Sequence, residues 1–174
     1  MKHWLTRAFS SILGLGILAA SAAPLAADPV PAGDDTKAAP ADLRKRGPVH
    51  CKDAEDIVLD KVLIEAKEVA VRISGACDVV IKNSVIKGGV HALLIEGSGD
   101  VELVNSTLDS AGSAVTIQGS GDVSLTGATV TGQKTAVLMQ GSGDLSAKDT
   151  RFQGKKVVQG TGEYEDRGGN TWKK

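Results

Sequence analysis

Five aspartates that recur at a constant step are the residues of this chain most able to do chemistry. Asp78, Asp100, Asp122 and Asp144 follow one another at intervals of 22 residues, and Asp56 lies one interval earlier. If successive intervals stack in register, their carboxylates form a row with a spacing of about 5 Å. Like charges at that separation repel one another, so a bound cation or a set of hydrogen bonds has to offset them.

Two arrangements could satisfy this row of carboxylates. In the first, a cation such as Ca²⁺ bridges successive carboxylates and turn carbonyls, which makes Asp78, Asp100, Asp122 and Asp144 candidate metal ligands. In the second, each carboxylate accepts hydrogen bonds from turn N–H groups, where glycines leave the backbone exposed. We favour the second, because calcium-binding glycine repeats place their aspartates at a much shorter step. No other cofactor is expected.

Each of these aspartates is the last residue of a repeated tetrapeptide. Gly-Ser-Gly-Asp occupies residues 97–100, 119–122 and 141–144, and a degenerate copy occupies residues 75–78. Repetition at a fixed interval of this size indicates a solenoid, in which each unit buries its apolar face by stacking on its neighbours.

When successive segments of 22 residues are aligned with one another, their columns show which strands lie before and after the repeated turn. Within each interval apolar residues alternate with other types, as in strands whose side chains point to opposite faces. The inward columns are rich in β-branched and aliphatic residues, which suits strands. These columns contain Val71, Leu93, Val115 and Val137; Val79, Val101, Val123 and Leu145; and Ile64, Ile86, Leu108, Val130 and Phe152.

Three short strands and three corners in each interval make one coil, and this pattern resembles the right-handed parallel β-helix family, the pectate-lyase-like solenoids, over residues 49–170. The corner residues Asn83 and Asn105 look like that family's asparagine ladder, which Gly127 and Asp149 interrupt. The resemblance implies an all-β, right-handed parallel β-helix of about five to six coils. The chain is also similar to exported bacterial β-helix proteins of unknown function, a likeness that implies no activity.

The N-terminal residues are expected to lie outside the solenoid. Lys2 and Arg7 precede a short apolar run and then small residues, as in a secretory signal peptide. We expect residues 1–27 to be this signal peptide, residues 28–48 a flexible linker, and residues 49–174 the β-helix domain with a C-terminal cap. The protein is therefore expected to be exported, periplasmic or secreted, with no stable membrane span after cleavage.

Both ends of the solenoid carry further signals. Cys51 precedes the first coil and Cys77 lies at the turn of the second, and in an exported chain they are expected to form a disulfide. After Gly154 the repeat shortens from 22 to 19 residues. Tyr164 and Trp172 follow this change, and we expect them to cap the last coil.

Charge and motif content exclude several functions. Without Lys2 and Arg7, 18 basic residues face 21 acidic ones, and no basic patch is interleaved with aromatic residues. The sequence therefore does not predict nucleic-acid binding. We assign no catalytic residue, because no His/Cys cluster, phosphate loop or nucleophile arrangement is recognisable. His91 is expected to be an exposed corner residue.

These observations predict a non-catalytic exported module, structural or binding, that presents a rigid β-helix face to a polysaccharide or an envelope protein. A polysaccharide-active enzyme, lyase or hydrolase, is one alternative, and it needs charged residues that converge in a groove. A calcium-stabilised carbohydrate-binding module is another. The oligomeric state is left open.

Overall fold

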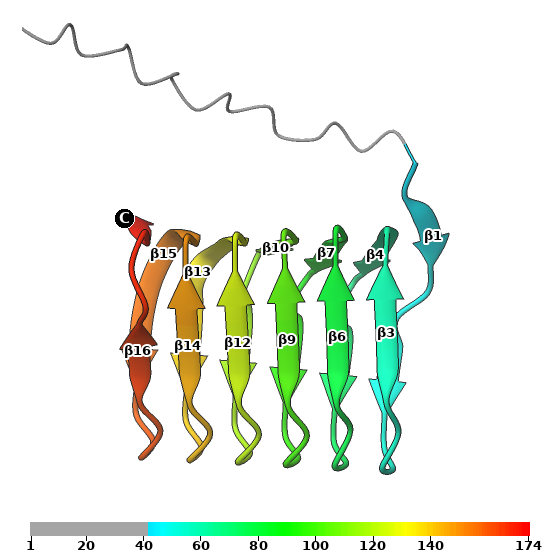
Figure 1. The fold of residues 1–174 in the computed structure, drawn as a ribbon, viewed down its shortest axis with the longest axis horizontal. Coiled ribbons are helices and arrows are strands. Elements are labelled where there is room, and N and C mark those ends of the chain that lie inside the picture. The colour runs from blue at the N-terminus through cyan, green and yellow to red at the C-terminus, as the bar shows by residue number, and fades with distance from the viewer. Residues whose placement is uncertain (1–41) are drawn as a thin grey trace, which may run out of the picture. The chain divides into compact units, whose positions relative to one another are not determined.

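The computed structural model describes residues 42–174, so the expected signal peptide and most of the expected linker lie outside the described residues. The described residues form short strands that stack as successive coils of a solenoid, with every strand pairing parallel (Figure 1). They contain no helix that could span a membrane. The parallel coils confirm the all-β solenoid that the 22-residue step predicts.

Each coil contributes one strand to each of three faces. Face 1 contains β2 (Val49–Cys51), β5 (Val69–Ile73), β8 (His91–Ile95), β11 (Ser113–Ile117) and the later parts of β13 (Thr129–Met139) and β15 (Arg151–Val158). Face 2 contains β3 (Ile57–Asp60), β6 (Val79–Lys82), β9 (Val101–Val104), β12 (Val123–Thr126), β14 (Leu145–Lys148) and β16 (Tyr164–Asp166). Face 3 contains β1 (Arg44–Arg46), β4 (Val62–Ala66), β7 (Val85–Gly88), β10 (Thr107–Ser110), the first residues of β13 and β15, and β17 (Thr171–Lys173).

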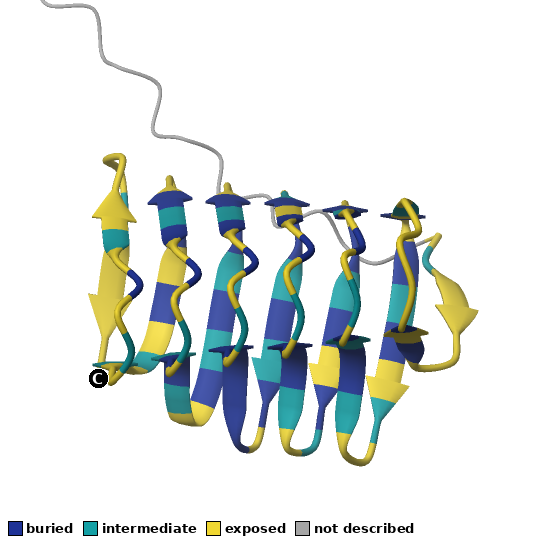
Figure 2. Ribbon diagram, turned by 90° about the horizontal axis from the view of Figure 1, so that it is seen from below, coloured by how far each residue is buried: buried dark blue, intermediate teal, exposed yellow. Residues whose placement is uncertain are grey.

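The strand register follows the predicted columns. Leu93 pairs with Val71 on one side and with Val115 on the other, and Val115 pairs with Val137. Buried residues alternate with more exposed ones along face 2, as in β6 and β12 (Figure 2), whereas β11 of face 1 is buried throughout. The inward columns are almost fully buried. The core is therefore a set of aliphatic stacks that run through the centre of the coils.

The corner between face 2 and face 3 adopts the left-handed conformation that its residue types predict. Asn83, Asn105, Gly127 and Asp149 have φ angles of 51°, 49°, 62° and 50°. Lys61 begins the same column with φ 52°, although lysine carries no preference for this conformation. The stack of coils therefore imposes the corner geometry even where the residue type does not favour it.

A column of small residues after this corner forms a buried hydrogen-bond ladder. The N–H of Val62 donates to the hydroxyl of Ser84, and the N–H of Ser84 donates to the hydroxyl of Ser106, both at 3.1 Å. The Ser106 hydroxyl donates to the carbonyl of Val104 at 2.9 Å. The next residue of the column is Ala128, which has no hydroxyl with which to continue the ladder.

The N-terminal end begins earlier than the sequence predicts. Residues 44–46, which fall in the expected linker, form β1 and pair in parallel with β4. Arg44 and Arg46 lie opposite Val62 and Ile64, so they continue an apolar column with charged residues. The linker prediction is wrong for this segment, because an edge strand of exposed charges has no apolar alternation to reveal it.

The disulfide between Cys51 and Cys77 is present and confirms its prediction. Both cysteines are buried, and the bond joins the end of β2 to the turn that precedes β6. The first coil is thereby fastened covalently to the second.

The C-terminal end closes with aromatic residues. The rings of Phe152 and Trp172 stack at 4.1 Å, and Tyr164 meets both rings edge-on. Trp172 lies opposite Phe152 in the strand register, so it covers the last core column as the sequence predicts. The predicted shortening is also found, since Thr131 pairs with Gln153 at a step of 22 whereas Leu138 pairs with Val157 at a step of 19.

Candidate binding surface on the acidic face

The aspartate column lies at the turn that leads from face 1 into face 2. The carboxylates of Asp78, Asp100 and Asp122 each accept a hydrogen bond from the backbone N–H of the next aspartate, one coil further on. These distances are 3.2 Å from Asp78 to Asp100, 2.9 Å from Asp100 to Asp122, and 2.8 Å from Asp122 to Asp144. The N–H of Glu163 donates to Asp144 at 2.7 Å, which carries the row into the shortened coil. Backbone amides therefore bind the carboxylates, but they belong to the next coil and not to the carboxylate's own turn.

The same column contains the candidate metal ligands Asp78, Asp100, Asp122 and Asp144. All four side chains are exposed. Within residues 42–174, no three His, Cys, Asp or Glu side chains are grouped as a metal ion would require. The observed role of these aspartates is to join successive coils through charge-assisted hydrogen bonds.

The glycines of the Gly-Ser-Gly-Asp turn are needed for close approach between coils. A Cβ atom on Gly121 would overlap the carbonyl oxygen of Gly99 directly below it, and one on Gly143 would overlap that of Gly121. Neither turn glycine is among the residues with positive φ. The turns therefore stack backbone against backbone, and this places the aspartates in a straight row.

A shallow groove of about 640 Å³ runs across face 2 beside this row. The aspartates from Asp78 to Asp144 and Glu163 line one margin, and the outward residues of the strands form the floor. Glu102 and Glu165 add two further carboxylates, whereas Ser124 and Ser146 provide hydroxyls between them. Arg167 is the one basic residue that lines the groove, and its guanidinium group forms an ion pair with Glu165 at 2.8 Å. The groove therefore presents hydrogen-bond acceptors and net negative charge.

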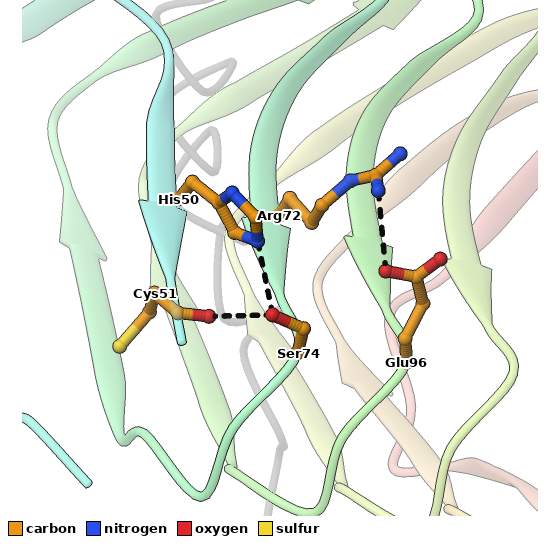
Figure 3. Close-up of polar contacts among 5 residues, drawn as sticks. All are labelled: His50, Cys51, Arg72, Ser74 and Glu96. Carbon is orange, nitrogen blue, oxygen red and sulfur yellow. Dashed lines mark hydrogen bonds and ion pairs between the residues drawn. The ribbon is translucent and has the colours of Figure 1, made fainter. Parts of the chain in front are cut away.

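Face 1 carries a second polar group near its N-terminal end (Figure 3). The Nε2 of His50 lies 2.9 Å from the hydroxyl of Ser74, and that hydroxyl lies 3.2 Å from the carbonyl oxygen of Cys51. Glu96 pairs with Arg72 at 3.5 Å, so it does not orient the histidine. Among the described residues no carboxylate pairs with His50, and the Ser-His contact lacks the third group of a catalytic triad.

Comparison with known proteins agrees with this geometry. The family model described as right handed beta helix region matches residues 47–171. The chain belongs to the right-handed β-helix family. No curated protein and no solved structure matched the chain.

The β-helix places His91 differently from its prediction. His91 begins strand β8, is half-buried, and has its Nδ1 2.8 Å from the Oγ1 of Thr116. The prediction of an exposed corner residue is wrong, because β8 starts two residues before Leu93, the position of the inward column, and therefore includes His91.

Several residues of the β-helix surface were not predicted as site residues. Glu102 belongs to no repeated column of acids and carries no motif that singles it out, and Glu165 and Arg167 follow the shortened coil. A step of 19 from Ser146 leads to Glu165 and could have found it. Gln118, Gln140 and Gln159 form an exposed amide ladder on the far side of the turn, at 3.1 and 3.0 Å.

Proposed function

We propose that this β-helix is an exported, non-catalytic module that binds an uncharged or cationic polysaccharide along face 2. The observation that carries the proposal is the groove, whose carboxylates and hydroxyls lie in rows that follow the backbone repeat. Such groups accept and donate hydrogen bonds to sugar hydroxyls. The negative charge of the lining favours a cationic or uncharged chain over an anionic one.

The rigidity of the surface supports binding. The aspartates are held by backbone amides of the neighbouring coil, and the floor residues stand on paired strands. Groups that are already ordered lose little conformational entropy when a ligand binds. An extended polymer that crosses the strands meets equivalent groups at each coil, about 4.8 Å apart.

The arrangement of acids supports a non-catalytic role. Hydrolysis by paired carboxylates needs two acids whose environments differ, one to give a proton and one to act as base or nucleophile. Asp78, Asp100 and Asp122 have matching environments, because each repeats the hydrogen bond of the one before. A row of equivalent acids suits repeated contacts along a polymer.

The buried disulfide supports export. Cys51 and Cys77 are bonded and almost inaccessible, and structural disulfides persist in oxidising compartments outside the cytosol. The signal-peptide prediction for residues 1–27 points the same way.

The proposal is tested by obstructing the groove without changing the core. Ser124→Arg with Ser146→Arg places two long side chains on the floor of face 2. The matched control, Thr107→Arg with Thr129→Arg, alters two outward, half-buried positions of face 3. We expect uncharged or cationic polysaccharides to retain the wild type and the control in a co-sedimentation assay, and the groove variant to bind at least about tenfold more weakly, a loss of about 1.4 kcal/mol.

Equal binding by both variants would contradict a site on face 2, and retention only by anionic polymers would contradict the charge argument. Release of new reducing ends from a bound polysaccharide would show an enzyme. If no polysaccharide binds but an envelope protein does, the ligand class in this proposal is wrong.

A further inference from the structure

The C-terminal end of the β-helix leaves one strand edge open on each face (Figure 1). These edges belong to the later part of β15, to β16 and to β17. Apolar side chains are uncovered at the same end. Val158 is 45% exposed although it continues the inward column of Met139, and Trp172 is 37% exposed. Open strand edges beside uncovered apolar side chains form a surface that another chain can cover.

The direction of the open backbone groups follows from the hydrogen bonds that each strand makes to the preceding coil. In β17 the N–H of Thr171 donates to the carbonyl of Thr150. Alternate residues of a strand direct their N–H and C=O groups to opposite sides. Trp172, the next residue of β17, therefore directs both of its backbone groups toward the open end.

The same alternation identifies the open groups of β16 and β15. The N–H groups of Arg167 and Gln159 both donate to carbonyls of the preceding coil. The residues at odd numbers in these two segments thus bond within the β-helix. The open backbone groups belong to Tyr164 and Asp166 in β16, and to Lys156 and Val158 in β15.

Strand β17 fits a two-fold axis that passes beside Trp172. If β17 of a second copy lies antiparallel to it, the two Trp172 residues face each other and exchange both backbone hydrogen bonds. The Trp172 ring stacks on Phe152 at 4.1 Å, so the second copy extends this stack from two rings to four. Lys173 then lies opposite Thr171, and Lys174 opposite Asn170, so neither lysine directly opposes a like charge.

The same axis places β16 of each copy against β15 of the other. In the antiparallel register that sets Tyr164 against Val158, Asp166 lies opposite Lys156 of the second copy. All four residues continue inward columns of their faces, and all four have open backbone groups. One apolar pair and one oppositely charged pair therefore meet between strands whose hydrogen-bonding groups also match.

The outward charges of these strands permit this register. Glu163 and Glu165 lie opposite uncharged residues of the second copy. Arg167 lies opposite Lys155 of the second copy, which is the one pair of like charges in the register. The guanidinium group of Arg167 is already bound to Glu165 at 2.8 Å, so a carboxylate accompanies the two bases.

We propose that this protein forms a tail-to-tail dimer, in which the C-terminal ends of two β-helices pair through β15, β16 and β17. A second copy is the partner because the rings, charges and open backbone groups of this end complement themselves about a two-fold axis. The N-terminal edge lacks this match, since an antiparallel copy of β1 would set Arg44 against Arg46. The inference is independent of the polysaccharide proposal for face 2.

A proline on the open edge of β15 tests the pairing. In the full chain, Val158→Pro removes an N–H that only the dimer uses, and edge strands accept proline at such positions. The matched control, Lys45→Pro, removes an open N–H of β1, because Arg44 is the neighbour that bonds to the next coil. Analytical ultracentrifugation should find dimers for the wild type and the control, and at least about tenfold weaker dimerisation for Val158→Pro. A monomeric wild type overturns the inference, as does a Val158→Pro variant that dimerises as well as the control.

Cross-linking tests the orientation and leaves Val158 intact. Thr171→Cys and Lys173→Cys each add one thiol at an exposed position, and the antiparallel register brings position 171 of one copy to position 173 of the other. Opposed residues of this kind have Cα atoms about 4.5 Å apart, which a disulfide can span. An oxidised mixture of the two variants should therefore give more disulfide-linked dimer than either variant alone. Equal yields from the mixture and from the single variants would overturn the proposed pairing.

Discussion

At the scale of single residues, His91 is a titratable side chain that the fold holds toward its neutral form. Burial lowers the pKa of His91 below its ordinary value of 6.5, nearby Arg72 lowers it further, and Glu96 opposes this effect. The unfolded chain therefore takes up a proton at a higher pH than the folded chain. Protonation then favours unfolding, so stability linked to this residue is present above the unfolded-state pKa and is lost as the pH falls below it.

We expect the free energy of unfolding of the wild type to decrease from about pH 7.5 to about pH 5.5, a window that contains the unfolded-state pKa. His91→Gln should flatten this part of the profile, because glutamine does not titrate. Urea denaturation at a series of pH values measures the effect, and His50→Gln controls for loss of an exposed histidine. Superimposable profiles for the wild type and His91→Gln would assign the pH dependence to other groups.

At the scale of an element, the serine column shows how a corner is held between coils. In two successive rungs a buried backbone N–H donates to the hydroxyl of the serine one coil on. In the next coil the same column has Ala128, which interrupts this pattern. The position is buried, and the residues before and after it in the column are Ser106 and Thr150. The ladder is therefore incomplete at one rung.

Ala128→Ser should complete the ladder, since its hydroxyl could accept from the N–H of Ser106. We expect the free energy of unfolding to rise by about 1 kcal/mol, the usual net value of one hydrogen bond. Ser106→Ala should lower it by about 1–3 kcal/mol, because the N–H of Ser84 would be buried without its acceptor. Chemical denaturation measures both, and a destabilised Ala128→Ser variant would show that the site lacks room for a hydroxyl.

Most strands and their register could be predicted from the sequence, because the same residue pattern recurs in every coil and each copy supports the others. One apolar residue at Leu93 indicates little, but its agreement with Val71, Val115 and Val137 fixes an inward column and the strand register. The hydroxyl contacts of Ser84 and Ser106 could not be predicted, since small size alone does not reveal a hydrogen-bond partner. The same holds for the aspartates, whose partners lie 22 residues away.

At the scale of the whole molecule, the two ends are secured by different means. The disulfide between Cys51 and Cys77 fastens the N-terminal coil across 26 residues of chain. Phe152, Tyr164 and Trp172 cover the C-terminal coil, with the rings of Phe152 and Trp172 stacked and the ring of Tyr164 edge-on to both. The cap positions were predictable from rare residue types, whereas β1 was not, because its three charged residues resemble a linker.

Replacing both cysteines with serine should lower the free energy of unfolding by about 3–4 kcal/mol, the entropic estimate for a loop of this length. The loss should begin locally, because only the first coil depends on the bond. Hydrogen exchange followed by mass spectrometry should show a larger increase of the exchange rate in β2 and β3 than in β9 and β12. Uniformly faster exchange along the chain would contradict a local role for the disulfide.

The constant step of the coils has a further consequence for how such a protein can change its length. The rungs of the aspartate and serine ladders meet only the coil before and the coil after. Duplication of one 22-residue unit between Asp100 and Asp122 would therefore add a rung to every ladder and leave the existing junctions intact. The shortened coil does not share this property, because its step of 19 residues fits only the coil that precedes it. Coils can therefore be added in the middle of the module without disturbing its ends, while its last coil marks a fixed boundary.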